Sequence, residues 1–184
     1  MKRLLTGAAA ILFLSMSAPT LSVAQNPGAH GKGAMRHEMS RPGTIKGLTA
    51  REEAAYRSGE GIGMARVAEL NHYPGPRHVL DLAEELHLTD EQAQTMERLM
   101  SSMKAQATAL GAQILEKEQA LDALFAAGTT DEAAVHALIA EIGDLKAELR
   151  FAHIRTHLAT RAALAPEQIA AYDRLRGHTG GDQQ

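Results

Sequence analysis

The chain contains no cysteine and no tryptophan, and aromatic residues make up only 3% of it. Without cysteine, no disulfide can stabilise the fold and no thiolate can act as a nucleophile or a metal ligand. The scarcity of aromatic residues argues against a sheet, because strands are enriched in aromatic and β-branched side chains. The aliphatic and Ala-rich composition that remains is typical of helices.

An excess of basic residues is also missing. The 19 Lys and Arg residues are outnumbered by 22 Asp and Glu residues, which gives a net charge of −3. Nucleic-acid binding requires clustered basic side chains that neutralise phosphates, so we expect no nucleic-acid partner. The sequence also contains no phosphate loop, no His-Glu-x-x-His zinc motif and no nucleophile beside a base in sequence. We therefore expect that the protein is not an enzyme.

The N-terminus has the layout of a secretory signal peptide. A basic Lys2-Arg3 pair precedes an apolar run from Leu4 to Leu14, and small residues at 22–24 precede Gln25. This pattern predicts a signal peptide at residues 1–24 with cleavage after Ala24. The alternative is an uncleaved membrane anchor. No later apolar run has the length of a membrane span, so the mature chain is expected to be soluble.

Residues 25–47 are rich in Gly and Pro and contain almost no large aliphatic side chain. Such a segment buries too little surface to offset its ordering entropy, so we predict that it is disordered. It carries residue types that suit soft metals, but incidental placement in a flexible tail is the favoured interpretation: His30, Met35, His37 and Met39. A helical domain is expected at 48–177, followed by a disordered tail at 178–184.

The stretch from 88 to 158 organises the domain. Thr89 and Gln92 have the spacing of a capping box, in which the threonine caps the helix and the glutamine reaches back to it. Apolar residues then recur in steps of three and four as far as a break at Gly128. A second apolar seam follows from Val135 to Thr156, with Thr129 as its expected cap. Two long seams joined by so short a break predict an antiparallel helical hairpin.

Short helices are expected on both sides of the hairpin. The first begins at a capping box formed by Thr49 and Glu52 and fails near Ser58, where three glycines lie within five residues. Further helices are expected at 64–70 and 77–87. A last helix follows Pro166, where Gln168 has the capping-box position but alanine replaces the threonine. One hairpin with short helices leaves broad faces uncovered, so we expect an antiparallel homodimer.

The first candidate function is an adaptable apolar surface. Met96, Met100 and Met103 are flexible, polarizable side chains on a helix with little charge, and they could bind unfolded client proteins. For the individual methionines, their spacing favours side chains that simply fill the hairpin seam.

The second candidate function is metal binding. His153 and His157 are four residues apart and share one helix face, which allows them to share one ion. The topology brings the end of that helix back toward His72 and His78. These four histidines are the candidate ligands for Zn, Ni or Cu, with carboxylate partners drawn from Glu84, Glu85 or Glu97. No cofactor is required for the first function, and a histidine pair on a solvated helix face is the alternative interpretation of the second.

The sequence resembles the periplasmic Spy/CpxP-like family, which includes the zinc-responsive ZraP type and the CnrX-type metal sensors. The resemblance rests on the secretory leader and on a repeated Leu-Thr-x-x-Gln signature. The signature stands as LTDEQ at 88–92 and, altered, as LAPEQ at 164–168. The segments NHYPGP at 71–76 and YDRLRG at 172–177 also look like a branch of heavy-metal sensor or resistance proteins.

The resemblance implies an all-α, cradle-shaped homodimer in the periplasm that acts in envelope stress. Spy-like members bind unfolded proteins without ATP, whereas ZraP-like and CnrX-like members bind metal and can signal to a membrane partner. The histidines do not match the CnrX-type ligand pattern, so no metal ligand is transferred from that type. We expect an ATP-independent chaperone-like protein that shields unfolded or metal-damaged clients, and the rival hypothesis is a metal-binding sensor or resistance protein.

Overall fold

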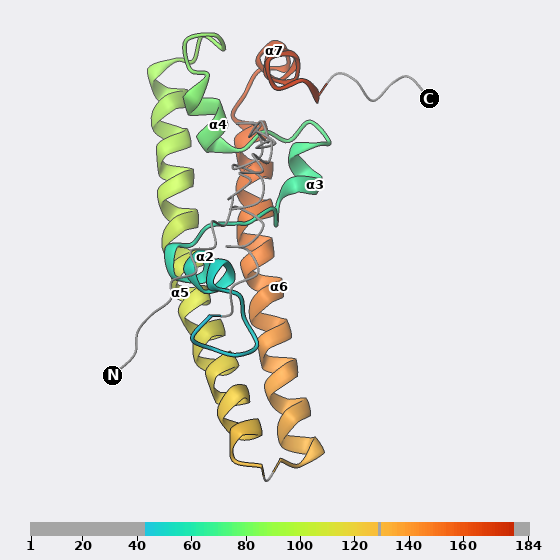
Figure 1. The fold of residues 1–184 in the computed structure, drawn as a ribbon. Helices are drawn as coiled ribbons and strands as arrows, with labels where there is room; N and C mark the ends of the chain where they lie inside the picture. The colour runs from blue at the N-terminus through green and yellow to red at the C-terminus, as the bar shows by residue number, and fades with distance from the viewer. Residues whose placement is uncertain (1–42, 129, 179–184) are drawn as a thin grey trace, which may run out of the picture.

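The computed structural model describes residues 43–128 and 130–178, and within these ranges it is entirely helical. The helices are α2 (Ala50–Ser58), α3 (Arg66–Glu69), α4 (Pro76–Asp81), α5 (Asp90–Ala126), α6 (Glu132–Ala162) and α7 (Pro166–Arg176). Helices α5 and α6 form the long antiparallel hairpin (Figure 1). Helix α2 crosses this hairpin near its middle, while α4 and α7 lie at the end away from the connecting turn (Figure 1). The predicted fold class is confirmed, and the dimer stays a prediction.

The capping box at the start of α5 is confirmed. The hydroxyl of Thr89 accepts a hydrogen bond from the Gln92 amide at 3.2 Å, and Gln92 Oε1 accepts one from the Thr89 amide at 3.1 Å. Two backbone donors at the helix start are thereby satisfied. At the other end, Gly128 adopts the left-handed conformation with φ of 68°, which ends the helix as expected.

The cap of α6 differs from the prediction. Helix α6 begins at Glu132, and Asp131 is its cap because its carboxylate accepts a hydrogen bond from the Ala134 amide at 2.9 Å. An aspartate at this position also interacts favourably with the positive end of the helix dipole. Thr129, the predicted cap, lies outside the described residues.

The short helices before the hairpin lie where they were predicted, but two of them, α3 and α4, are shorter than predicted. Helix α2 has the expected capping box and ends at left-handed Gly59. Helix α3 has only four residues, and α4 stops at Asp81 rather than at His87. Turns fill the rest, because the chain must reverse before α5 while keeping Leu86 buried.

The core consists of two apolar clusters along the hairpin. The first holds α2 against its middle and contains Ile45, Leu48, Tyr56, Ala107, Ile114, Leu115 and Leu149. The second holds α4 and α7 against the open end and contains Val79, Leu86, Met96, Leu164 and Tyr172. Gly111 allows α2 to lie directly on α5, because a Cβ at that position would be 2.0 Å from the Tyr56 carbonyl oxygen.

The packed domain begins before Leu48, where the sequence placed its start. Ile45 is only 6% exposed, and its backbone amide donates to Glu53 Oε1 at 2.6 Å. This hydrogen bond lowers the pKa of the Glu53 carboxyl below its usual range. A buried carboxylate that accepts backbone and hydroxyl hydrogen bonds therefore fixes residues 43–47 against α2. The predicted signal peptide and the segment 25–42 lie outside the described residues.

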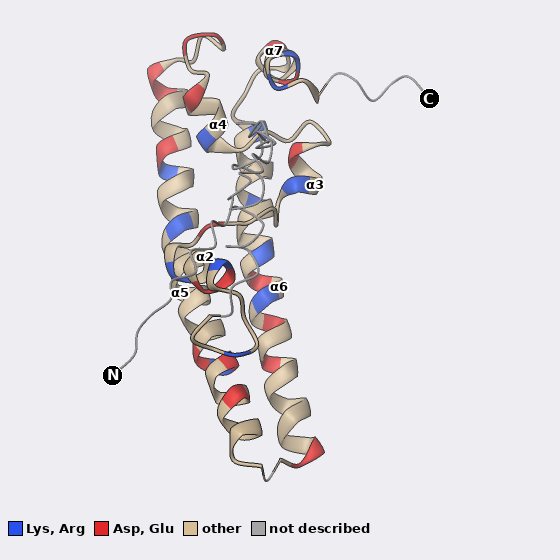
Figure 2. Cartoon of the chain, in the orientation of Figure 1, with Lys and Arg blue, Asp and Glu red and all other residues tan. Residues whose placement is uncertain are grey.

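Charges are mixed along the long helices. In Figure 2, both signs of charge occur on α5 and α6, and on α6 the Asp and Glu positions lie mainly toward the connecting turn and the Lys and Arg positions toward the open end. Two ion pairs join the two helices: Lys146 Nζ lies 2.7 Å from Glu118 Oε1, and Lys117 Nζ lies 2.5 Å from Glu141 Oε2. Among the described residues, no helix has the length and apolar character needed to cross a bilayer.

Candidate functional site

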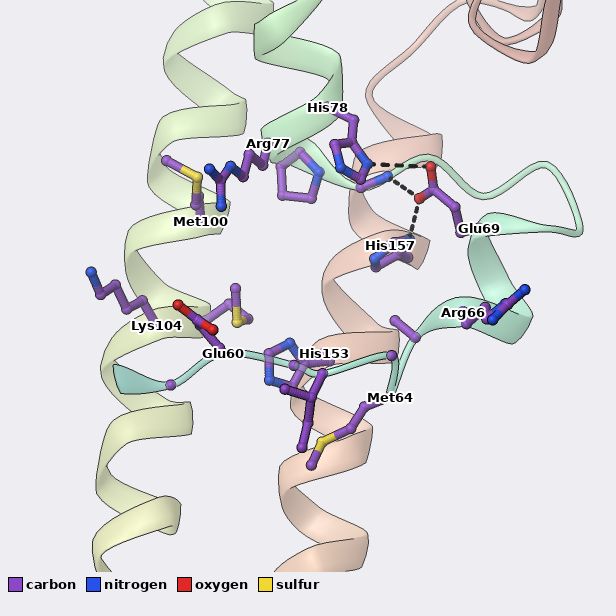
Figure 3. A pocket seen from close by; sticks show the side chains of 18 of the residues that line it. Glu60, Met64, Arg66, Glu69, Arg77, His78, Met100, Lys104, His153 and His157 are labelled. Carbon is purple, nitrogen blue, oxygen red and sulfur yellow. Dashed lines mark hydrogen bonds and ion pairs between the residues drawn. The ribbon is translucent and has the colours of Figure 1, made fainter. Parts of the chain in front are cut away.

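A pocket of about 870 Å³ lies between the upper halves of α5 and α6, covered by the segment from α2 to α4 (Figure 3). Three histidines line it, one from α4 and two from α6, together with three methionines and Glu69 of α3. These residues are His78, His153, His157, Met64, Met100 and Met103. The pocket therefore unites residues that the sequence assigned to two separate functions.

Glu69 is the hydrogen-bond centre on one side of this pocket. Its Oε2 accepts the Gly75 amide at 3.1 Å and lies 3.6 Å from His157 Nδ1. Its Oε1 lies 3.3 Å from His78 Nδ1 and also accepts the buried Tyr172 hydroxyl. Burial, and then the contact with Glu69, raise the pKa of Tyr172 well above its usual range, so the hydroxyl keeps its proton.

These contacts give Glu69 a structural role. A carboxylate accepts at about four lone-pair sites, and its neighbours already engage both oxygens. His157 is fixed too, because its Nδ1 donates to the Tyr73 carbonyl oxygen at 2.7 Å. This bond leaves Nε2 as the acceptor of the neutral imidazole.

His153 is different, because its ring is buried but unpaired. The residue is only 7% exposed, and its Nε2 is buried with no hydrogen-bond partner in the described structure. Desolvation, and secondarily the nearby His157, lower the pKa of His153, so the ring is neutral near pH 7. Gly61 lies against the ring: a Cβ there would be 2.9 Å from His153 Nδ1. Most buried polar atoms in proteins are paired, so this unpaired nitrogen requires an explanation.

The four predicted histidine ligands do not all converge. His78, His153 and His157 line the pocket, whereas His72 pairs with Asp173 of α7 at 2.7 Å. The expected carboxylate partners are not at the pocket either, since Glu84, Glu85 and Glu97 are exposed and do not line it. Within the described ranges, no group of three or more His, Asp or Glu side chains has an arrangement that could hold a metal ion.

The sequence missed Glu69. Glu69 lies in a four-residue helix before the Pro-Gly-Pro turn, and only the folding of that turn brings it to the histidines. The NHYPGP segment could have indicated this role of Glu69, because its rigid turn fixes the position of the residues that precede it.

The predicted client-binding methionines separate into two groups. Met96 is completely buried in the second core cluster, so it fills the hairpin seam and cannot meet a client in this structure. Met100 and Met103 are half-buried and line the pocket. Ile62, which also lines the pocket, is 39% exposed, and other large apolar side chains are exposed by 47–58%: Val67, Leu70, Phe125, Ile139, Phe151, Leu158 and Leu175.

The two Leu-Thr-x-x-Gln-like segments meet at the open end of the hairpin. Gln92 Nε2 donates to Gln168 Oε1 at 2.8 Å, and Gln168 Nε2 donates back to Gln92 Oε1 at 3.0 Å. Each Nε2 also donates to a backbone carbonyl, of Ala163 and Leu86 respectively. Each Oε1 also accepts the amide of its own helix cap. Both side-chain amides thus use all their donors and acceptors, and we call this pair the glutamine lock.

One comparison with known proteins identifies a family. A family model described as "LTXXQ motif family protein" matches residues 76–176, which is more than half of the chain. The matched region begins at α4 and ends with α7, so it contains the glutamine lock. Searches of curated proteins and of solved structures found no match.

Proposed function

Because the chain belongs to the LTXXQ motif family, whose members are Spy/CpxP-type and generally periplasmic, we propose that it is an envelope-stress protein that binds unfolded clients without ATP. The proposal includes a homodimer and the apolar outer surface of α6 as the client-binding surface. The protein would need no cofactor for this activity.

The observation that carries the proposal is the exposed apolar face of α6. Phe151 and Leu158 are 52% and 47% exposed and are seven residues apart, which places them on one face of the helix. Leu149 and Ala152 of the same helix are buried against α5, so Phe151 and Leu158 are not part of the seam. Arg155 lies over the Phe151 ring at 5.8 Å and adds a positive charge beside this face. Exposed apolar side chains next to charge suit a surface that holds unfolded chains briefly.

An aggregation assay tests the proposal. The mature protein, with a metal chelator present, is mixed with a reduced, unfolded model protein, and light scattering is recorded. Each apolar side chain contributes about 1 kcal/mol at this exposure, so the variant Phe151→Ser/Leu158→Ser should bind clients roughly tenfold more weakly or worse. Leu175→Ser is the matched control, because Leu175 is equally exposed but lies on α7. No suppression by the unsubstituted protein at excess would contradict client binding.

A second candidate function is a metal-binding sensor or resistance protein that conveys metal occupancy to a membrane partner. The observation that favours it is the pocket, where three histidines meet and the Nε2 of His153 has no partner. Calorimetric titration with Zn²⁺, Ni²⁺ and Cu²⁺ tests it, with His153→Ala/His157→Ala as the comparison. Equal heats for both proteins would remove the hypothesis.

A further inference from the structure

Soft ligand atoms from three separate parts of the chain line the pocket. Met103 and Met100 lie three residues apart on one face of α5, Met64 comes from the segment between α2 and α3, and His153 comes from α6. Figure 3 shows Met64 and His153 on the same side of the pocket. Met64 and Met103 also pack on the same apolar cluster, whose members include Ala107 and Leu149. Met64, Met103 and His153 all line the same pocket, so the two thioethers and the imidazole border one cavity.

The imidazole of His153 has a lone pair that no hydrogen-bond donor among the described residues uses. The Nε2 of His153 is buried and unpaired, and the methionines that line the same pocket carry thioethers, which are only weak acceptors. A lone pair that is withheld from water costs free energy unless a ligand uses it.

The charge around the pocket does not suit a hard divalent cation. Its lining contains Arg66, Arg77 and Lys104 against Glu60, Glu69 and Asp81, so three positive charges balance three negative ones. The carboxylate nearest to the histidines, Glu69, is already engaged by its neighbours. Neutral thioether and imidazole ligands require no such excess of negative charge when the ion is soft and monovalent.

We propose that Met64, Met103 and His153 bind one Cu(I) ion. The proposal rests on the second candidate function, metal binding, and assigns that function an ion class and a set of ligands. Thioethers select Cu(I) over Zn²⁺ and Ni²⁺, and no ligand has to lose a proton when the ion binds.

A chelator competition measures this site. The mature protein is titrated anaerobically, with excess reductant, into a coloured Cu(I)–chelator complex, and the loss of colour gives the affinity. Met64→Leu/Met103→Leu keeps volume and apolar character, so the fold should be retained, and far-UV circular dichroism checks it. The double variant should lose at least about tenfold in Cu(I) affinity, since even second-shell changes cost that much. Met96→Leu is the control, because Met96 is buried in the other core cluster, and it should bind Cu(I) unchanged.

Three results would overturn the assignment. One is that the protein removes no Cu(I) from the chelator, and another is that the double variant binds as tightly as the unsubstituted protein. The third is that Met35→Leu/Met39→Leu, in the segment before the described residues, abolishes binding instead. A parallel titration with Zn²⁺ keeps the two proposals apart: Zn²⁺ binding without Cu(I) binding would refute the copper site and leave the second candidate function standing.

Discussion

The glutamine lock and the histidine pocket lie on the same helical hairpin: the lock joins α5 to α7, and the pocket lies between α5 and α6. In the lock, Gln92 and Gln168 use every donor and acceptor of their side-chain amides. In the pocket, His153 is buried more deeply than either glutamine, yet its Nε2 has no partner. Two polar groups in similar surroundings have opposite hydrogen-bonding states.

This difference in hydrogen bonding distinguishes a structural role for the glutamines from a binding role for the pocket. A fully satisfied polar network stabilises one arrangement of helices and has no capacity left for a ligand. A buried, unpaired nitrogen lowers stability and keeps its lone pair for something that enters the pocket. We therefore assign the family signature a structural role, and we assign binding to surfaces that the signature only positions.

Removing one side of the lock should have the largest effect on stability. Gln168→Leu leaves the partners of the amide unpaired, which costs about 1–3 kcal/mol. For a chain of this length, each kcal/mol lost lowers the unfolding temperature by about 2–4 °C, and calorimetry measures this shift. Gln94→Leu on the exposed side of α5 is the matched control and should stay within about 0.5 kcal/mol of the unsubstituted protein. Equal effects of the two substitutions would show that the lock contributes nothing.

The same type of substitution in the pocket should act in the opposite direction. His153→Leu replaces an unpaired buried polar ring by an apolar side chain of similar volume, so the free energy of unfolding should rise by about 1 kcal/mol. Urea unfolding monitored by circular dichroism measures the change. His136→Leu, on the exposed face of α6, provides the control. A loss of stability in His153→Leu comparable to that in Gln168→Leu would contradict the contrast between the two regions.

Acidic pH should increase the difference in stability between the unsubstituted protein and His153→Leu, because the pKa of His153 is lowered from its ordinary 6.5 in the folded state. The folded protein binds the proton less readily than the unfolded chain does. The stability linked to His153 is therefore fully present above pH 6.5 and is lost as the pH falls through the folded-state pKa. Urea unfolding at a series of pH values should show that His153→Leu lacks this loss, so the two proteins diverge on acidification. Parallel curves would show that His153 is not desolvated.

The smallest effect should come from the glycine that covers the ring. In Gly61→Ala the new Cβ would lie 2.9 Å from His153 Nδ1, so the ring must shift. The pocket offers space for that shift, so the cost should be below the usual overpacking range, at less than about 1 kcal/mol. Thermal unfolding measures the cost, and the ¹⁵N shifts of the imidazole report the ring position. Gly143→Ala, which meets nothing within 4 Å, is the control and should stabilise α6. Unchanged imidazole shifts would show that Gly61 does not position the ring.

Much of the fold could be predicted because its determinants are local. The capping box of Thr89 and Gln92, the left-handed Gly128 and the apolar seams depend on residues within a few turns of one another. The lock could not be predicted in this way, because it joins two glutamines 76 residues apart. Each copy of the signature correctly predicted a helix start and gave no sign that the copies touch.

The candidate site was predicted in part for the same reason. His153 and His157 share one face of α6 because they are four residues apart, and the return of α6 brings both to the pocket that His78 also lines. The diversion of His72 to Asp173 and the central position of Glu69 depend on how the Pro-Gly-Pro turn and α7 pack. Such contacts are set by tertiary structure, which leaves no periodic signal in the sequence.

The most direct test of the division between lock and pocket is the unfolding temperature measured with and without Ag⁺, a redox-inert substitute for Cu(I). A ligand at about 100 times its dissociation constant stabilises a folded protein by about 2.7 kcal/mol. We predict that Ag⁺ raises the unfolding temperature of the unsubstituted protein and of Gln168→Leu equally, and leaves that of His153→Leu unchanged. An equal rise in all three proteins, or a rise that is lost in Gln168→Leu, would contradict the account.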